Sequence, residues 1–379
     1  MKKALLMAPM GSVHRRFNKA NIEALKECGY EVHLLANFSV GDGPEVHNAD
    51  FVKECEGKGI YTHSLPFSRG SLLKNINLIS SINSLIQSHG FQIVHTHTET
   101  GGILLRLCKN PQNASFFCFT PHGMSFYKGS SLISQLVYRP IEKWICQRMD
   151  ANLAMNREEM DSLLKWNRKT ARFVHGIGLD ISRMKVSSES CRNGIRKGLK
   201  IPEDALLILS IGELNTNKNH AAVIKALKSV DRAVRPYYLI CGVGEEEANL
   251  KKLIKESGLE EYVTLAGYRS DIPQIVAASD IFVFPSFHEG LPVSVLEAMA
   301  GGLPVMASAI RGNVDLITDD NNGYLFSPEN PDEITDKLNR LLTSAEKRKK
   351  MGELNAQLAE QYSFDVVKKE LVDIYSGLK

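Results

Sequence analysis

Two glutamates in the second half of the chain, Glu289 and Glu297, stand in a pattern that suits binding of a phosphorylated sugar. Gly290 and Pro292 follow the first glutamate, and proline is favoured in a first helical turn because its missing N–H group is no loss there. The free N–H groups of such a turn form an anion site with the helix dipole. A carboxylate two turns further on repels phosphate but accepts hydrogen bonds from sugar hydroxyls. The segment predicts a polyol-binding pair beside a phosphate-binding helix end; capping or solvation would explain each glutamate alone.

A lysine and a histidine are the other candidate catalytic residues. Lys218 lies in the sequence GELNTNKNH, directly after an apolar run. A lysine on such a strand-to-helix loop can neutralise a diphosphate leaving group as negative charge develops on it. His122 ends another apolar run and precedes Gly123, which would place its ring at the carboxyl end of a strand. The alternatives are a solvated surface lysine and a structural histidine.

Several other kinds of site are excluded or disfavoured. The sequence has no GxxxxGK[ST] loop, which excludes a P-loop kinase or ATPase, and no DxD pair at a strand end. We therefore expect a metal-independent mechanism with no cofactor. His95 and His97 share one face of a strand, but no further ligands accompany them. The turn at 242–244 lacks the third glycine of a dinucleotide fingerprint, and three glutamates at 245–247 would repel a pyrophosphate, which disfavours NAD.

Short apolar runs alternate with amphipathic stretches along the whole chain, and this alternation indicates parallel sheets covered by helices on both faces. The expected strands lie at 3–9, 30–37, 59–66, 91–98, 115–122, 151–156, 171–178, 205–212, 237–244, 262–267, 280–286 and 303–310. The expected helices lie at 15–28, 72–89, 132–149, 157–166 and 364–378, with others beginning near Asn217, Glu245, Asp271, Val293 and Asp332.

The fold class is therefore α/β, with two doubly wound, Rossmann-like halves facing each other across a cleft. The polar segment 187–206 has little strand character and separates them. We place the first domain at 1–184 and the second at 185–361, with the helix of 362–379 packing back on the first domain. Ligands bind at the carboxyl ends of strands in such sheets, so the loops there are where the site is expected.

Composition and charge narrow the choice of partners. The 379 residues are 43% hydrophobic and 23% charged, which is ordinary for a globular protein of two or three domains and excludes disorder. A net charge of +3 gives no reason to expect nucleic acid. Residues 1–180, however, carry 21 Lys and Arg against 15 Asp and Glu. The expected helices there combine apolar faces with Lys74, Arg139, Lys143 and Arg148, which suits an anionic membrane surface.

The cysteines and the N-terminus bear on location. Seven cysteines are scattered without a CxxC pair, as in proteins of reducing compartments. The apolar run after Lys3 is too short for a signal peptide, and no run approaches 18 apolar residues. We expect a cytoplasmic protein, at most peripheral on the inner face of the cytoplasmic membrane.

The sequence resembles a known family. Residues 289–300 resemble the E-x7-E signature of retaining family-4 glycosyltransferases with the GT-B fold, as do the segments 267–286, 301–308 and 321–328. The phrases VHTHT and TPHG, with the helix after Asn156, resemble the subgroup that builds bacterial capsule and O-antigen polysaccharides. The resemblance implies transfer of a sugar from a nucleotide diphosphate sugar, expected to be a UDP-sugar, to a glycan acceptor carried on polyprenyl diphosphate. The acceptor hydroxyl would attack from the leaving-group side, and a diphosphate oxygen would take its proton.

The resemblance also implies a role for each candidate residue. Glu297 would bind the ribose, Glu289 would lie by the donor sugar, and the backbone of Gly290 and Leu291 would read the sugar hydroxyls. The remaining roles are diphosphate binding by Val293, Ser294, Gly11 and Lys218, nucleobase contact by the backbone of Arg269, donor-sugar contact by His122, and acceptor contact by His14.

The chain departs from the family pattern in two places. Glu213 stands five residues before Lys218, where the family often has an arginine, so another cation could serve the phosphate or Lys218 could act with helix N–H groups alone. The loop 9–14 lacks the family's paired glycines. A non-catalytic sugar-nucleotide-binding protein and a dinucleotide-dependent oxidoreductase are the alternative functions.

Overall fold

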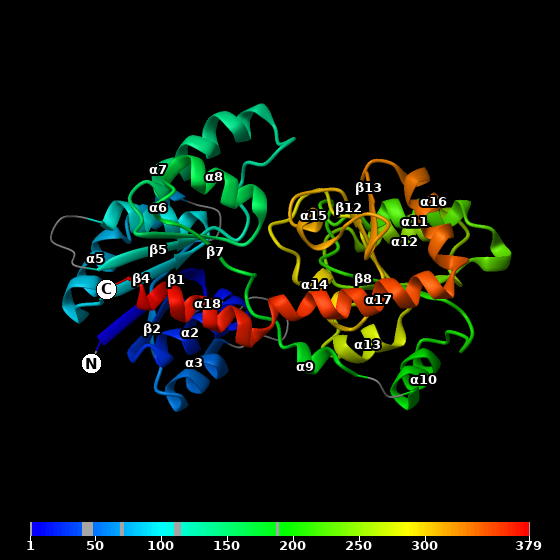
Figure 1. The fold of residues 1–379 in the computed structure, drawn as a ribbon, viewed down its shortest axis with the longest axis horizontal. Helices are drawn as coiled ribbons and strands as arrows, with labels where there is room; N and C mark the ends of the chain where they lie inside the picture. Colours follow the sequence, from blue (N-terminus) through cyan, green and yellow to red (C-terminus); the bar gives the residue numbers. More distant parts are fainter. Residues whose placement is uncertain (1, 40–47, 69–71, 110–114, 187–188, 379) are drawn as a thin grey trace. The chain divides into compact units, whose positions relative to one another are not determined.

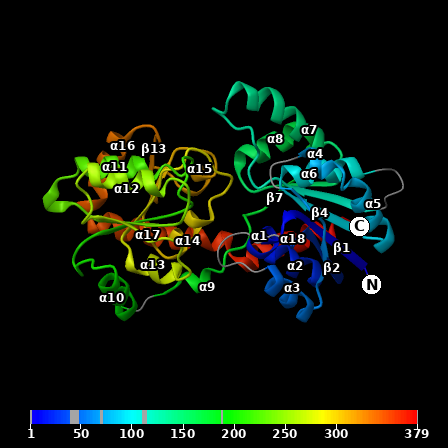
Figure 2. The same cartoon turned by 180° about the vertical axis from the view of Figure 1, so that it is seen from behind.

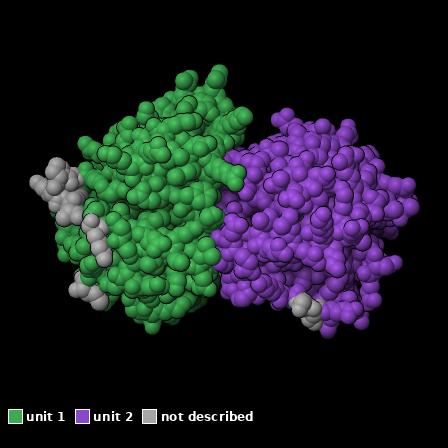
Figure 3. Space-filling view, viewed as in Figure 1, with its two compact units in different colours: residues 1–178, 364–379 green, residues 179–363 purple. Residues whose placement is uncertain are grey.

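The protein is described by a computed structural model that covers residues 2–39, 48–68, 72–109, 115–186 and 189–378. The chain forms two compact units, which Figure 3 shows in different colours. Unit 1 contains residues 1–178 and 364–379, and unit 2 contains residues 179–363. The chain therefore passes from one unit to the other twice, after Gly178 and after Ser363.

Unit 1 is built on a seven-stranded sheet with the order β3-β2-β1-β4-β5-β6-β7, in which every pairing is parallel. Its strands are β1 (Lys2–Met10), β2 (Tyr30–Asn37), β3 (Tyr61–Ser64), β4 (Ile93–His97), β5 (Phe116–Thr120), β6 (Ala151–Ala154) and β7 (Ala171–Phe173). The order reverses between β1 and β4, as in a doubly wound fold.

Helices cover both faces of this sheet because its strands bury apolar side chains on either side, in two separate cores. The helices of unit 1 are α1 (Gly11–Phe17), α2 (Lys19–Glu27), α3 (Asn48–Gly57), α4 (Leu72–Ile76), α5 (Ile79–His89), α6 (Glu99–Cys108), η1 (Ser134–Tyr138), α7 (Arg139–Cys146), α8 (Arg157–Asn167) and α18 (Phe364–Ser376). The last helix, α18, packs beside α2 on one face, as Figures 1 and 2 show from opposite sides.

Unit 2 repeats the architecture with a six-stranded parallel sheet of order β10-β9-β8-β11-β12-β13. Its strands are β8 (Leu207–Ile211), β9 (Tyr237–Cys241), β10 (Val263–Leu265), β11 (Ile281–Phe284), β12 (Val305–Ser308) and β13 (Gly323–Phe326). Its helices are α9 (Ile181–Met184), α10 (Glu189–Gly198), α11 (His220–Ser229), η2 (Arg232–Val234), α12 (Glu247–Glu256), α13 (Ile272–Ala278), α14 (Val293–Ala300), α15 (Asn313–Leu316), α16 (Pro331–Leu342), α17 (Ala345–Ala359) and η3 (Glu360–Tyr362). Two apolar cores, one on each face, hold the helices to the sheet.

The two Rossmann-like domains confirm the expected fold class, and each of the twelve expected strands is present. The expected loop at 9–14 was wrong in part, because α1 begins at Gly11. The seven cysteines are free, and none is exposed. In the part of the chain that the structure describes, no helix is both long and apolar enough to cross a bilayer.

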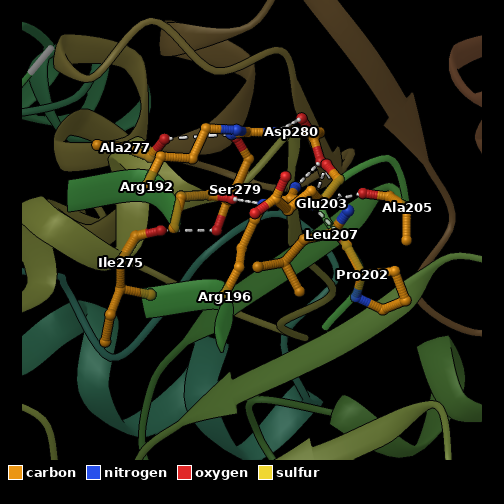
Figure 4. Close-up of polar contacts among 11 residues, drawn as sticks. Arg192, Arg196, Pro202, Glu203, Ala205, Leu207, Ile275, Ala277, Ser279 and Asp280 are labelled. Carbon is orange, nitrogen blue, oxygen red and sulfur yellow. Dashed lines mark hydrogen bonds and ion pairs between the residues drawn. The ribbon is translucent and has the colours of Figure 1, made fainter. Parts of the chain in front are cut away.

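A fully buried arginine fastens α10 to the sheet of unit 2 (Figure 4). The guanidinium of Arg196 donates to the carbonyls of Ala205 at 2.7 Å and Ala278 at 3.0 Å, and to Asp280 Oδ2 at 2.6 Å. The same carboxylate accepts from the N–H of Leu207 at 2.7 Å, and its other oxygen accepts from Arg192 at 2.6 Å. The buried charge is thus paired and hydrogen-bonded, the condition under which burial of a charge is tolerated.

Candidate functional site

The structure brings together Lys218 and Glu289, which are 71 residues apart. They lie on the loops after β8 and β11, the neighbouring strands at which the sheet order of unit 2 reverses. Ligands of doubly wound sheets bind outside the carboxyl ends of strands at such a point. Lys218 Nζ donates to Glu289 Oε1 at 2.5 Å and lies 4.9 Å from the centre of the Phe284 ring. Both side chains are mostly buried, so their positions are restricted.

Two asparagines hold the Lys218 loop against the Glu289 loop. Asn217 donates its side-chain amide to the carbonyl of His288 at 3.1 Å and accepts the N–H of the same residue at 3.1 Å. Asn219 donates to the carbonyls of Pro285 at 3.2 Å and Pro328 at 2.8 Å, with a left-handed backbone at φ 52°. These positioning residues had not been predicted, because asparagines in a polar loop give no sequence signal for a contact so distant in the chain.

Arg311, in the turn after β12, supports the same loop. Its Nε donates to the carbonyl of Glu289 at 3.0 Å, and the residue is 7% exposed. Gly312 follows with φ 81°, and a Cβ there would lie 2.3 Å from the Gly290 carbonyl oxygen, so only glycine allows this approach. A buried cation therefore lies beside Glu289, a feature that had also not been predicted.

Helix α14 begins directly after this loop. Its N-cap is Pro292, which has no side-chain acceptor, so no side chain caps the N–H groups of the first turn. Val293 and Ser294, the predicted diphosphate contacts, are the first two residues of that turn and are partly buried, as are Gly290 and Leu291. Glu297 follows one turn later, and burial raises its pKa to about 7, although Arg183 opposes the shift.

The remaining candidates of unit 2 lie near the neighbouring strand ends. Glu213 is exposed and accepts a hydrogen bond from Asn215, so it lies outside the Lys218–Glu289 pair. Arg269 follows β10 and forms two hydrogen bonds to Asp271, at 2.8 Å and 2.5 Å. The turn at 242–244 packs on the loop after β8, where Leu214 N donates to Val243 O at 3.0 Å.

In unit 1, His122 follows β5 with an unusual backbone. Its φ is 60°, a left-handed conformation that is uncommon for a residue other than glycine. Its Nε2 lies 2.7 Å from Nδ1 of His97, the last residue of β4, and the Phe17 ring lies 5.5 Å away. Burial lowers the pKa of His122 to about 4, so the ring is neutral at physiological pH. Backbone strain of this kind concentrates at functional sites.

Three carboxylates hold the segment that follows His122. Met124 N donates to Glu159 at 2.9 Å, and Ser125 N donates to Glu142 at 2.8 Å and to Glu99 at 3.0 Å. Glu142 is fully buried. Burial raises the pKa of Glu142 to about 10, and its hydrogen bond with Glu99 and the charge of Glu99 add to the shift. Glu142 is therefore a neutral acid at physiological pH.

His95, unlike His97, belongs to a closed network in the core of unit 1. Its Nδ1 lies 2.8 Å from the Tyr375 hydroxyl of α18, and its Nε2 lies 2.8 Å from Thr120 Oγ1. Asn21 of α2 donates to the same tyrosine at 2.8 Å. This histidine therefore joins α18 to the sheet and has no nitrogen left for a ligand.

The first-loop candidates, Gly11 and His14, have structural explanations within unit 1. A Cβ on Gly11 would lie 2.8 Å from the Phe38 ring, so the glycine is needed for packing. His14 is 1% exposed, with Nε2 3.1 Å from the carbonyl of Leu35 and Nδ1 2.9 Å from Asn18 Nδ2. This burial speaks against the expected acceptor contact by His14. The diphosphate contact predicted for Gly11 stays a prediction.

Comparisons with known proteins match both units. The family model for the Glycosyl transferase 4-like domain matches residues 15–175, and that for Glycosyl transferases group 1 matches residues 192–357. The Bacillus subtilis protein assigned as glycosyltransferase EpsD is 28% identical over 99% of this chain and 97% of its own length. The Escherichia coli enzyme UDP-Gal:alpha-D-GlcNAc-diphosphoundecaprenol alpha-1,3-galactosyltransferase is 28% identical over 72% of this chain and 71% of its own.

Solved structures share the fold over the full length. Anabaena HepE in complex with UDP has a TM-score of 0.81 at 19% identity and covers 99% of this chain and 100% of its own. Sucrose-phosphate synthase from Thermosynechococcus elongatus has a TM-score of 0.81 at 18% identity and covers 100% of this chain and 99% of its own. Two doubly wound domains, matched by family models in both halves and by a relative along the whole length, make this chain a glycosyltransferase with the GT-B fold.

Proposed function

We propose that the protein is a retaining glycosyltransferase that moves a sugar from a UDP-sugar to a lipid-linked glycan in the synthesis of a bacterial surface polysaccharide. The observation that carries this proposal is the Lys218–Glu289 pair at the switch point of unit 2, beside the start of α14. A cation, a carboxylate and free helical N–H groups are together the groups that a sugar diphosphate requires.

The chemistry assigned to these groups is electrostatic. The bond between C1 of the sugar and the diphosphate oxygen breaks as the acceptor oxygen bonds to C1 on the same face. The acceptor proton passes to a diphosphate oxygen. Lys218 and the first turn of α14 stabilise the negative charge on the leaving diphosphate, and the carboxylate of Glu297 accepts hydrogen bonds from the ribose. This route needs no protein side chain as a base, because the diphosphate oxygen takes the proton. It also needs no metal, because Lys218 and the helix N–H groups stabilise the charge.

The relatives support the choice of substrates. The Escherichia coli relative is named for a UDP-Gal donor and an acceptor on diphosphoundecaprenol, and HepE was solved with UDP. His122 is the residue of unit 1 proposed to contact the donor sugar, and its strained backbone and neutral ring support that role. Its convergence with Lys218, Glu289 and Glu297 on one groove stays a prediction.

The decisive experiment is transfer from a panel of UDP-sugars to a polyprenyl-diphosphate-linked sugar, with and without EDTA. We expect one donor to give product at equal rates with and without EDTA. NMR of the product should show that the anomeric configuration of the donor is retained. An inverted product would contradict the retaining mechanism, and loss of transfer with EDTA would contradict its independence from a metal. Binding of UDP-sugars without transfer would favour the second candidate, a non-catalytic binding protein, which the exposed Glu213 in place of an arginine motivates.

We also propose that unit 1 associates with the cytoplasmic leaflet. The segment from Leu132 through η1 exposes large apolar side chains to water, at 79% for Leu132, 71% for Ile133 and 75% for Leu136. Exposed basic residues follow directly, at Arg139, Lys143 and Arg148. We call these six residues the apolar–basic surface. Contiguous exposed apolar side chains beside basic ones suit insertion among anionic lipid headgroups.

A further inference from the structure

Three histidines of unit 1 lie together, away from His122. They are His33 in β2, His63 in β3 and His89 at the end of α5, and one ring nitrogen from each lies within 4.8 Å of the others. β2 is separated from β5, which precedes His122, by β1 and β4, so the two places are about 14 Å apart across the sheet. We propose that these three histidines form a binding site for a divalent transition metal, with zinc as its natural occupant.

The fold brings the three rings to one face of the sheet. Leu35 of β2 pairs with His63 of β3, and His33 lies two residues before that leucine, so the side chains of both histidines point to the same side. Helix α5 packs on this side and ends at His89, where Gly90 takes a left-handed backbone with φ 61°. Residues from two strands and a helix end therefore meet at the β3 edge.

Hydrogen bonds indicate which nitrogen carries the lone pair on two of the three rings. Nε2 of His33 donates to Glu31 Oε1 at 2.9 Å, so Nδ1 of His33 has the lone pair and accepts the Nε2–H of His63 at 2.8 Å. A metal ion between these two nitrogens would take the place of that proton. Nδ1 of His89 lies 3.0 Å from Ser88 Oγ and 3.2 Å from the carbonyl of Leu85, and donation from Nδ1 to that carbonyl leaves Nε2 of His89 with a lone pair. A carboxylate or carbonyl behind each ligating imidazole is the usual outer shell of a metal site.

The ring nitrogens, which all lie within 4.8 Å of one another, can hold a tetrahedral ion once the rings move. Nδ1 of His33 and Nε2 of His63 are 2.8 Å apart, whereas two imidazole nitrogens on one zinc ion are separated by about 3.3 Å. His63 is only partly buried and lies on an edge strand, so its ring can move by this amount.

Three imidazoles with an open fourth position favour zinc, copper or nickel over magnesium or calcium, which require oxygen ligands. Water would fill the fourth position, because His63 and His89 are reached by solvent. The sequence predicts no metal for sugar transfer, and this site takes no part in that reaction.

Zinc binding to the metal-free full-length chain tests the proposal, with affinity measured by competition with a chromophoric chelator. We expect one tight equivalent, and a visible spectrum of tetrahedral coordination when cobalt replaces zinc. Glu31→Gln should weaken zinc binding by about 10–100-fold, and His63→Gln and His89→Gln by at least that much. Circular dichroism spectra and urea unfolding should show that the variants remain folded.

His175→Gln is the matched control, because His175 is a partly buried histidine of the same unit that pairs with Glu370. It should bind zinc as the unmodified chain does. The proposal is overturned if the unmodified chain binds no zinc tightly, or if the affinity of the His63→Gln/His89→Gln double variant equals that of the unmodified chain. Loss of zinc on His122→Asn alone would also overturn it, by placing the metal at the other histidine cluster.

Discussion

Lys218 is the residue whose removal should affect catalysis most. Its ammonium pairs with Glu289. The described loop of residues 212–219 contains no second lysine or arginine that could replace it. Lys218→Ala should lower turnover by about 100-fold or more, the usual loss for one electrostatic stabiliser. Initial rates at saturating donor measure this. Lys225→Ala, an exposed lysine on the following helix α11, should retain full activity and serves as the control.

Equal turnover in Lys218→Ala and the unmodified chain would show that another group stabilises the leaving diphosphate. Arg311 would then be the first candidate, because its guanidinium lies against the Glu289 backbone. Glu297→Ala provides a contrast within the same site. It should weaken binding of the nucleotide through lost ribose contacts while leaving the first turn of α14 intact.

The neutral acid Glu142 should make unit 1 less stable as pH rises. Its pKa is about 10 in the folded state against an ordinary value of 4.5, so folding retains a proton that the unfolded chain releases. The stabilisation is complete below about pH 4.5 and is lost as pH rises toward 10, by up to about 1.4 kcal/mol per pH unit. Glu142→Gln should remove this dependence, since its amide can also donate to Glu99.

Urea unfolding of both proteins at pH 6 and pH 9 measures the effect. We expect Glu142→Gln to gain stability relative to the unmodified chain at the higher pH. Parallel pH dependence in the two proteins would contradict a protonated Glu142.

The residues of the site were predictable from sequence to different degrees. Glu289, Glu297 and Lys218 stand out because each has a defined spacing from a glycine, a proline or a strand end. Arg311, Asn217 and His97 do not, because their roles come from contacts between loops that only the sheet order brings together.

Among the helices, α10 is held to the sheet of unit 2 by two arginines, Arg192 and the fully buried Arg196. Arg196→Met should reduce the free energy of unfolding of unit 2 by about 3–5 kcal/mol, because it removes the buried one of the two arginines that pair with Asp280 and leaves four backbone carbonyls without this donor, those of Pro202, Glu203, Ala205 and Ala278. Arg192→Met is the matched control, since its side chain is 31% exposed and its loss leaves Asp280 paired with Arg196. If both variants lost the same free energy of unfolding, the buried contacts of Arg196 would contribute no more to stability than the partly exposed contacts of Arg192.

The strands were far easier to predict than several other elements. Buried parallel strands are continuous apolar runs, so all twelve expected segments appear in the structure. Strand β13 was not predicted as a strand, because only four residues, Gly323–Phe326, separate two polar turns. Helix α17 was not predicted either, since its sequence AEKRKKMGELNAQLA has little apolar periodicity and few buried residues.

For the molecule as a whole, the apolar–basic surface predicts salt-sensitive binding to membranes. Flotation with vesicles containing anionic lipid should bring the protein to the vesicle fraction at low salt and release part of it at high salt, because each basic residue near the surface contributes about 1 kcal/mol. Replacing Leu132, Ile133 and Leu136 by serine should abolish flotation at either salt concentration.

The control variant has serine in place of three exposed valines elsewhere, Val234, Val314 and Val366. This variant should float with the vesicles as the unmodified chain does. A protein that stays soluble at both salt concentrations, and that glycosylates a free sugar as readily as a lipid-linked one, would contradict membrane association.

The position of α18 has a consequence for the order in which the chain folds during synthesis. Unit 2 is one continuous segment, 179–363, whereas unit 1 is completed only by residues 364–379. Until those residues leave the ribosome, the face of unit 1 that buries Val367, Leu371 and Tyr375 stays uncovered, and His95 lacks its hydroxyl partner. Domains usually mature in the order of translation. In this protein the domain that is begun first must be the last to finish, and its nascent apolar face stays open to water throughout the synthesis of unit 2.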